Sequence, residues 1–315
     1  MTLRRESYAK SYFSNYSHKL AKRENSFVTI EVISQGEIVA KLNTLGSTLI
    51  GLTDQDFHLI EPETATDLYP GSILVPWPNR IRDGRYSYAQ TNYQLPINEP
   101  VRSNALHGLV AYRDCEITNK RKNGLELDYV LDSPTIYPGK LDLSVIYQIQ
   151  DKSLHVEISC KNIGSIPAPY GVSIHTYLVA GKATKNNQVS LKLLADQYLK
   201  VDSRRFLPTE LSPCSNTEFD FRNLRQIGAL FIDHAFRYQN GLAWQVELID
   251  ENGSGVILGF DSASNGIQIH TADRNGSSNS RKSLAVEPMS CPPDAFNSGV
   301  DLINLEPGDI HISKI

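Results

Sequence analysis

Residues 284–300 read LAVEPMSCPPDAFNSGV, and this stretch puts one carboxyl group in an unusual setting. An apolar run from Leu284 to Val286 leads to Glu287, and prolines follow at positions 288, 292 and 293. Because proline has a fixed φ and no N–H for a ladder, the pattern predicts that a strand ends at Glu287, on a rigid, half-buried corner. A carboxyl group there has a raised pKa and a fixed direction, as a general acid or base requires. The alternative is a solvated residue at a strand end.

Period-two alternation of apolar and polar residues dominates the chain from Ser26 onward. It predicts strands at 27–33, 37–42, 141–149, 154–160, 243–250 and 266–272, with polar turns at 34–36, 150–153 and 250–253. Helical periodicity is scarce, and the candidate helices are short ones such as 223–230. The sequence therefore predicts an all-β fold, a large antiparallel sandwich with few short helices. No linker rich in Pro, Gly or Ser divides the chain, so we expect a single domain over 26–315.

The first 25 residues (1–25) form a basic extension rich in Ser and Tyr, which we expect to be a disordered arm or a short helix. They contain no apolar core of the signal-peptide type, and no later segment approaches the length of a membrane span. The sequence thus predicts a cytoplasmic protein that does not bind membranes.

Composition narrows the class of ligand. The net charge is −4, from 31 basic and 35 acidic residues, which gives no basic surface for nucleic acid. Small neutral ligands fit this balance better than polyanions do. The four cysteines are far apart and form no C-x-x-C pair, so we expect buried free thiols rather than a zinc ribbon or a redox dithiol.

Two segments before residue 110 hold groups that could bind a small polar ligand. Asn79 and Arg80 follow Trp77, and an aromatic ring beside a guanidinium suits the C–H face and the hydroxyls of a sugar. A surface ion pair between Arg80 and Asp83, or a similar carboxylate, is equally open. His107 precedes a glycine, at the edge of an expected strand, where it could approach a ligand closely or serve only the structure.

Two later segments add further titratable groups. On strict alternation, Ser173, His175 and Tyr177 lie on one face of a strand, and three polar groups in a row favour a functional surface. Asp233 follows an apolar run and could accept hydrogen bonds from ligand hydroxyls or cap a turn. The chain has no phosphate loop, nucleophile elbow, H-E-x-x-H or dinucleotide motif. These observations favour proton transfer without a cofactor, hydrolysis, or binding alone.

In their order, these segments resemble the aldose 1-epimerases, also called galactose mutarotases. The resemblance runs from about residue 27 to 312, and the EPMSCPPDAFNSG segment is its most specific part. The matching pieces are PWPNRI, NALHG, YPGKLDLSVIY, PAPYGVSIHTYL, LKVDSRRFLPTEL, FIDHAF, VEPMSCPPDAFNSG and LEPGD.

This resemblance implies a β-supersandwich of the galactose mutarotase type that binds a monosaccharide in a cleft across a sheet. It implies that Glu287 is the general base that takes the proton from the anomeric hydroxyl. It further implies that His175 is the general acid that protonates the ring oxygen, and that His107 orients the sugar and stabilises charge. Mutarotation needs one base and one acid, so we expect no metal and no other cofactor. We expect the two groups to face each other across a gap the size of a pyranose.

The resemblance also implies a set of sugar-binding residues. Arg80 and Asp233 correspond to the groups that hold the sugar hydroxyls, and Asn79 supports Arg80. Tyr177 is a further candidate for sugar contact because it shares a face with the proposed acid. His270 stands where this family usually has a tyrosine, which leaves the preference among aldoses open.

Four alternatives remain open from the sequence. His107, His175 and Glu287 could form a metal site with two histidines and one carboxylate. Asp233 and Glu287 could be the paired carboxylates of a glycoside hydrolase. The chain could be a non-catalytic sugar sensor of the same fold, or a mutarotase for sugar phosphates. In the last case basic residues at 82, 85 and 274 would bind the phosphate. The protein is expected to be a monomer or a homodimer.

Overall fold

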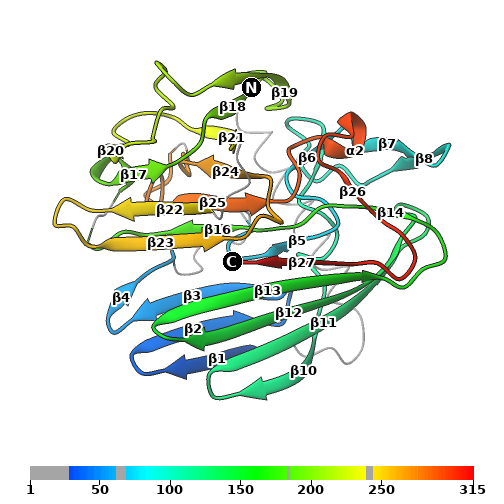
Figure 1. Ribbon diagram of the computed structural model, residues 1–315, viewed down its shortest axis with the longest axis horizontal. Coiled ribbons are helices and arrows are strands. Elements are labelled where there is room, and N and C mark those ends of the chain that lie inside the picture. Colours follow the sequence, from blue (N-terminus) through cyan, green and yellow to red (C-terminus); the bar gives the residue numbers. More distant parts are fainter. Residues whose placement is uncertain (1–27, 62–68, 183–184, 239–243, 275) are drawn as a thin grey trace.

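The computed structural model describes residues 28–61, 69–182, 185–238, 244–274 and 276–315. In these residues the fold consists of strands that pair antiparallel, one short α-helix, α2 (Ala295–Ser298), and one 3-10 helix, η1 (Asn186–Gln188). None of the helices described here is long and apolar enough to cross a membrane. The predicted all-β antiparallel architecture with few short helices is confirmed (Figure 1). The expected extension at 1–25 lies outside the described residues.

Two sheets occupy the lower half of Figure 1. One is a meander of β1 (Ile30–Gln35), β2 (Ile38–Asn43), β3 (Thr48–Asp54) and β4 (Phe57–His58). The other has the order β10 (Glu116–Arg121), β11 (Gly124–Asp132), β12 (Lys140–Gln150), β13 (Ser153–Asn162) and β27 (Ile310–Lys314). The strands predicted at 37–42, 141–149 and 154–160 correspond to β2, β12 and β13, and the predicted polar turns join β1 to β2 and β12 to β13.

An eight-stranded sheet in the upper half of Figure 1 matters most for function. Its strands run in the order β19 (Pro208–Pro213), β18 (Gln197–Val201), β21 (Asp233–Arg237), β24 (Gly266–His270), β25 (Leu284–Met289), β15 (Ser173–Ile174) and β5 (Ile73–Leu74). A further strand, β16 (Thr176–Leu178), also pairs with β25. Residues that are far apart in the sequence therefore become neighbours across this sheet.

Four smaller sheets complete the described fold. One has four strands in the order β20 (Arg225–Gln226), β17 (Ser190–Leu193), β22 (Trp244–Ile249) and β23 (Gly255–Phe260). The other three have two strands each: β6 (Arg80–Arg82) with β9 (Asn104–Leu106), β7 (Arg85–Tyr88) with β8 (Thr91–Gln94), and β14 (Ala168–Tyr170) with β26 (Ile303–Leu305). All four cysteines are buried and free, as expected.

The predicted helix at 223–230 is wrong. This segment holds β20, where Leu191 of β17 pairs with Arg225, and it contributes Ile227 to the core. Gly228 follows in the left-handed conformation, with φ of 61°, which an α-helix does not continue through. Pairing with β17 therefore outweighs the weak helical periodicity of this short segment.

One face of the eight-stranded sheet packs into the main core. Its side chains lie in one contiguous buried cluster with inward residues of β12 and β13, such as Val145 and Ile158. The side chains that the sheet contributes to this cluster include Ile174, Phe236, Ile267, Ile269 and Val286. Because alternate residues of a strand point to opposite faces, the other face of this sheet carries a second, different set of side chains.

The expected end of the strand at Glu287 is also wrong. β25 continues through Pro288, which lies opposite Ile267 of β24, and ends at Met289. Every residue of β25 is buried, so Glu287 lies within a buried strand and not on a half-buried corner. On its other side β25 meets a break between β15 and β16, and a residue that lacks an N–H is tolerated where a ladder is interrupted.

Candidate active site

The register of the eight-stranded sheet brings His175 and Glu287 face to face. Counting inward from the fixed pairs places His175 opposite Glu287 across the break between β15 and β16. Opposite residues of an antiparallel pair project their side chains to the same face. The fixed pairs on either side are Ser173–Met289 and Thr176–Val286.

Two rows of side chains cross this second face of the sheet. In the first row Gln268 lies between Ala235 and Glu287, and His175 follows. The second row is Asp233, His270, Ala285 and Tyr177. The face that turns away from the main core is therefore polar, although it is largely buried.

The carboxyl group of Glu287 and the imidazole of His175 are in direct contact. His175 Nε2 lies 3.4 Å from Glu287 Oε1, and the two residues are only 5% and 2% exposed. The expectation that a gap the size of a pyranose separates them is therefore wrong, because neighbouring strands hold their side chains next to each other. The two groups can nevertheless touch the same small ligand.

Burial sets the protonation of this pair. It raises the pKa of Glu287 well above its usual value, and the negative charge of Asp233 acts in the same direction. Burial lowers the pKa of His175 to about 3, assisted by the charge of His270. Burial therefore favours the uncharged form of both groups, with the proton on the carboxyl group of Glu287 and a neutral imidazole at His175 when no ligand is bound.

His107 is fixed by reciprocal hydrogen bonds with Asn79. The backbone N–H of His107 donates to the backbone carbonyl of Asn79 at 2.9 Å. In return, the backbone N–H of Asn79 donates to the ring atom Nδ1 of His107 at 3.2 Å. Nδ1 is therefore an acceptor, and the neutral ring carries its proton on Nε2. Burial, followed by the charges of His175 and Arg80, lowers the pKa of His107 well below its usual value and keeps the ring neutral. The His107 ring lies 5.1 Å from that of His175.

Asn79 and His107 both have positive φ, 56° and 61°, a conformation that side chains other than glycine rarely adopt. Such strain is typical of functional sites. The adjacent Gly108 is explained by packing instead of ligand approach, because a Cβ there would lie 2.2 Å from the carbonyl oxygen of Val75.

The metal alternative fits this arrangement poorly. Potential ligand atoms of His107, His175 and Glu287 do lie within 4.8 Å of one another. A metal bound to Nε2 of His107 would move the proton to Nδ1, against the N–H of Asn79. A metal bound to Nδ1 would take the acceptor from that N–H. Either choice breaks a buried hydrogen bond, so the donor set favours a neutral imidazole that donates from Nε2.

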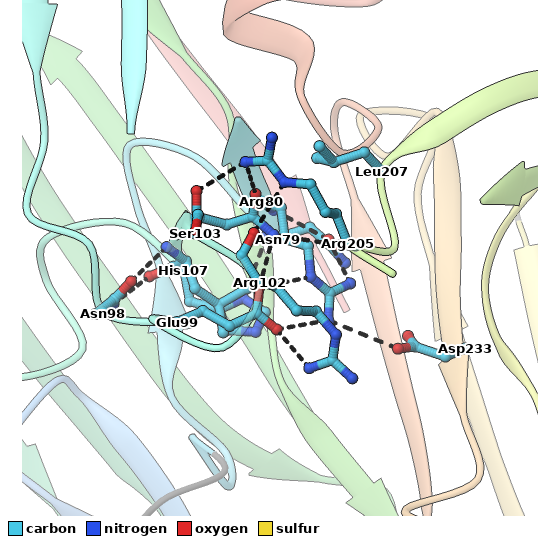
Figure 2. Close-up of polar contacts among 12 residues, drawn as sticks. Asn79, Arg80, Asn98, Glu99, Arg102, Ser103, His107, Arg205, Leu207 and Asp233 are labelled. Atoms are coloured by element: carbon cyan, nitrogen blue, oxygen red, sulfur yellow. Dashed lines mark hydrogen bonds and ion pairs between the residues drawn. The ribbon is translucent and has the colours of Figure 1, made fainter. Parts of the chain in front are cut away.

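Arg80 is a buried member of the site and does not form the surface ion pair considered from the sequence. Its Nη2 lies 3.7 Å from Asp233 Oδ2, and its Nε and Nη2 donate to Glu99 at 3.0 and 3.1 Å (Figure 2). Asp83 instead pairs with Arg205. Asn79 contacts Arg80, because its Oδ1 accepts from the Arg80 backbone N–H at 3.0 Å and from Arg80 Nη1 at 3.4 Å.

Asp233 is held as an ionised carboxylate. Burial alone would raise its pKa, but the electrostatic interactions with His270 and Arg80 and a hydrogen bond from Gln268 lower it. That bond, from Gln268 Nε2 to Asp233 Oδ1, measures 2.6 Å. The site thus combines a fixed charge on Asp233 with a neutral acid at Glu287.

The remaining predicted residues lie beside these groups. The rings of Tyr177 and His175 are 4.9 Å apart, and the guanidinium of Arg274 lies 5.6 Å from the Tyr177 ring. His270 lies opposite Asp233, and its Nδ1 is 3.3 Å from the Ile232 carbonyl. The fold therefore gathers all eight residues singled out from the sequence around one sheet face.

Sequence reasoning missed Gln268 and Glu99. Gln268 shares its strand face with His270, so alternation within GIQIH contained the signal that could have identified it. Glu99 lies in a loop whose position relative to Arg80 follows only from the pairing of β6 with β9.

Three buried polar atoms of the site have no hydrogen-bond partner within the described residues. They are His175 Nδ1, Gln268 Oε1 and Glu287 Oε2. Buried polar groups without partners are rare in folded proteins, and a cluster of three requires an explanation. A ligand with several hydroxyl groups would supply the missing partners.

An apolar cavity of about 300 Å³ adjoins the same face. Its lining includes Ala235, Gly266, Met289, Leu211 and Pro292, but neither His175 nor Glu287. It shares Ala235 with the first polar row and provides space beyond that row.

The family model for aldose 1-epimerase matches residues 29–315. The uncharacterized protein YihR of Escherichia coli strain K12 is 37% identical over 284 residues, which cover 89% of both chains. The galactose mutarotase of Homo sapiens is 25% identical over 270 residues, which cover 79% of this chain and 76% of that protein.

Solved structures show a similar fold. A GalM/aldose epimerase homologue from C. elegans superposes with a TM-score of 0.79 at 20% identity, covering 91% of this chain and 97% of that one. The galactose 1-epimerase of Lactobacillus acidophilus NCFM gives a TM-score of 0.75 at 18% identity, covering 93% and 94%. These likenesses concern the fold.

The raised pKa of Glu287 predicts that this residue destabilises the fold. Above about pH 4.5 an unfolded chain ionises Glu287 while the native protein keeps it protonated, so its contribution to stability falls as pH rises. We expect Glu287→Gln to raise the free energy of unfolding by at least about 1 kcal/mol at pH 8 and by less at pH 5.

Thermal and urea unfolding between pH 5 and 8 measure this difference. Glu306→Gln, at an exposed glutamate, is the matched control and should leave stability nearly unchanged. A Glu287→Gln protein that is less stable than the wild type at pH 8 would contradict the assignment of a neutral buried carboxyl.

Proposed function

The chain belongs to the aldose 1-epimerase family, and on that premise we propose that it interconverts the α and β anomers of a free aldohexose such as glucose or galactose. The observation that carries the proposal is the buried contact of 3.4 Å between His175 Nε2 and Glu287 Oε1, beside buried polar atoms that have no hydrogen-bond partner in the described residues. That arrangement suits a substrate that needs a proton removed at one oxygen and delivered at another.

In the proposed reaction Glu287 takes the proton from the anomeric hydroxyl O1, and His175 gives a proton to the ring oxygen O5. The bond between C1 and O5 breaks as the C1–O1 bond becomes a carbonyl, and the ring opens to the free aldehyde. Rotation about C1–C2 presents the other carbonyl face, and the same two groups reverse the transfers. Because O1 and O5 are both bonded to C1, an acid and a base in contact with each other can reach both.

The position of the proton determines how this pair begins a catalytic cycle. In the empty site it rests on Glu287, whereas a base at Glu287 requires the proton on His175. The contact of 3.4 Å allows one transfer to interconvert the two forms. Sugar hydroxyls that donate to Glu287, together with the positive charge of Arg80, would favour the ionised form. No metal or other cofactor enters this scheme.

The other groups are assigned to sugar binding. The Arg80 guanidinium, through the edge that does not contact Glu99, and the Asp233 carboxylate would hold adjacent hydroxyls, as donor and acceptor respectively. His107 would donate from Nε2 to a sugar oxygen without changing its own charge. Tyr177 and His270 would border the sugar, with His270 in the position that departs from the family pattern.

A mutarotase for sugar phosphates and a non-catalytic sugar sensor are the alternatives, but no contact in the described residues favours either. The arginines considered for a phosphate, at 82, 85 and 274, already have polar partners. In order, these partners are Asp294, Gln94 and Glu61. A polarimetric panel of anomerically pure aldoses, with and without a 6-phosphate, distinguishes all three functions. A hydrolase acting through Asp233 and Glu287 would instead release reducing sugar from glycosides.

We expect Glu287→Gln and His175→Asn each to lower the rate of mutarotation at least about a hundredfold, because each removes one partner of the proton transfer. Polarimetry on freshly dissolved α-glucose and α-galactose measures the rate, and circular dichroism checks that the fold is intact. Near-normal turnover by either variant would refute the assigned role.

The pKa directions also predict an unusual pH profile. Below the pKa of His175, about 3, the pair holds two protons and has no base, while above the raised pKa of Glu287 it holds none and has no acid. We therefore expect kcat/KM to show no acid limb in the usual titration range of histidine and to fall only as the pH rises through the raised pKa of Glu287. Stopped-flow polarimetry across this range measures it, and an acid limb centred near pH 6 would be inconsistent with the shared-proton pair.

Asp233→Ala and Arg80→Ala should mainly weaken sugar binding. Each substitution removes a charged group that would hydrogen-bond to the sugar. The loss of such a bond corresponds to a rise in KM of about 10- to 100-fold. Steady-state kinetics separate KM from kcat, and thermal melting checks that the fold is intact. A loss of kcat at unchanged KM would contradict the assignment of these groups to substrate binding.

A further inference from the structure

Glu99 occupies the centre of the polar network in Figure 2. It lies in the loop between β8 and β9, and its side chain is only 11% exposed. Its two carboxylate oxygens each accept two hydrogen bonds from neighbouring side chains. The donors are Arg80 Nε and Nη2, Arg102 Nη1 and Asn104 Nδ2, at distances of 2.8 to 3.1 Å.

The contact with Arg80 is bidentate, and it determines which side of the guanidinium faces the site. Glu99 occupies the edge formed by Nε and Nη2. On the other edge, Nη1 donates one hydrogen bond to Asn79 Oδ1 at 3.4 Å, and Nη2 faces Asp233. A planar guanidinium held along one edge has little freedom to rotate, so its remaining donors have fixed directions.

The same contact keeps Arg80 and Asp233 apart. Arg80 Nη2 lies 3.7 Å from Asp233 Oδ2, beyond hydrogen-bonding distance, although the two groups are opposite in charge and their side chains are only 10% and 12% exposed. Without the competing carboxylate of Glu99, Arg80 would close onto Asp233. The two groups would then satisfy each other instead of a ligand.

Glu99 is itself held in place from several sides. Arg102 pairs with it at 2.9 Å, and the guanidinium of Arg102 lies over the Phe206 ring at 4.4 Å. Asn104, a buried residue of β9, donates to Glu99 and also to the carbonyl of Arg205. Glu99 is therefore a rigid acceptor for Arg80.

We propose that Glu99 is a positioning residue for substrate recognition, which holds Arg80 short of Asp233 so that both remain available to sugar hydroxyls. This inference rests on the proposed function, because it assigns the Arg80 edge to the sugar. Glu99 does not touch the substrate. It acts through Arg80 by preorganising the donor edge before the sugar arrives.

The first test is Glu99→Gln, which keeps the shape but removes the charge and one acceptor oxygen. We expect the KM for the aldose to rise about tenfold and kcat to change less than about twofold. Asp83→Asn, which removes a neighbouring acidic partner from Arg205 without touching Arg80, is the matched control and should leave KM unchanged. An unchanged KM in Glu99→Gln, or an equal rise in Asp83→Asn, would overturn the proposal.

A double-mutant cycle with Arg80→Lys separates positioning from general damage. Lysine cannot form the bidentate contact, so Glu99→Gln should have almost no further effect on KM in that background. If the factors by which the two substitutions raise KM instead multiply in the double variant, Glu99 acts independently of Arg80, and the proposal is overturned.

A measurement without substrate keeps this inference distinct from the proposed function. In ¹⁵N-labelled protein the Nε–H of Arg80 should give a slowly exchanging signal, assigned by its loss in Arg80→Lys, that disappears in Glu99→Gln and persists in Asp83→Asn. Should Glu99→Gln not fold, Glu99→Asp, whose shorter side chain cannot reach both nitrogens, takes its place. A wild-type protein that turned over no aldose would refute the proposed function. Persistence of the Arg80 signal in the Glu99 variant would refute the positioning role.

Discussion

A polar sheet face that is buried from solvent constrains everything else in this structure. The eight-stranded sheet packs Val286 and its neighbours into the core, and the alternation that achieves this places Glu287 on the opposite face. Antiparallel register then sets His175 beside it, and burial disfavours charge on both groups. The arrangement of lowest energy is a pair with one proton between a carboxyl and an imidazole. Burying such a pair lowers the stability of the fold, but the pair is suited to transferring protons.

The ionisable groups of the site are of two kinds. Around Asp233 and Arg80, hydrogen bonds from Gln268 and to Glu99 keep the charges fixed and separate. Around Glu287 the polar atoms lack such partners, and the charge is replaced by a proton that can move. Groups with fixed charge suit recognition of hydroxyls, whereas a poorly solvated pair suits acid–base chemistry. Whether a carboxyl group of the site is charged or protonated therefore depends on whether guanidinium and amide donors lie near it.

Much of this could be predicted from the sequence, because alternation reports strands and faces directly. The regular patterns of β12 and β13 gave their limits closely, and the pattern around His175 placed Tyr177 on the same face. Predictions failed where tertiary pairing overrides a local rule. Pro288 does not end β25 because the neighbouring ladder is already interrupted there. Glu99 could not be singled out, since its importance lies in a contact with Arg80 across two strands and a loop.

The central claim is that one sugar oxygen lies against each member of the His175–Glu287 pair. A crystal structure of the Glu287→Gln protein with bound glucose or galactose tests it most directly. We expect O1 within hydrogen-bonding distance of residue 287 and O5 within hydrogen-bonding distance of His175, with Arg80 and Asp233 on the other hydroxyls. A sugar bound elsewhere, or bound here with O1 and O5 turned away from this pair, would contradict it.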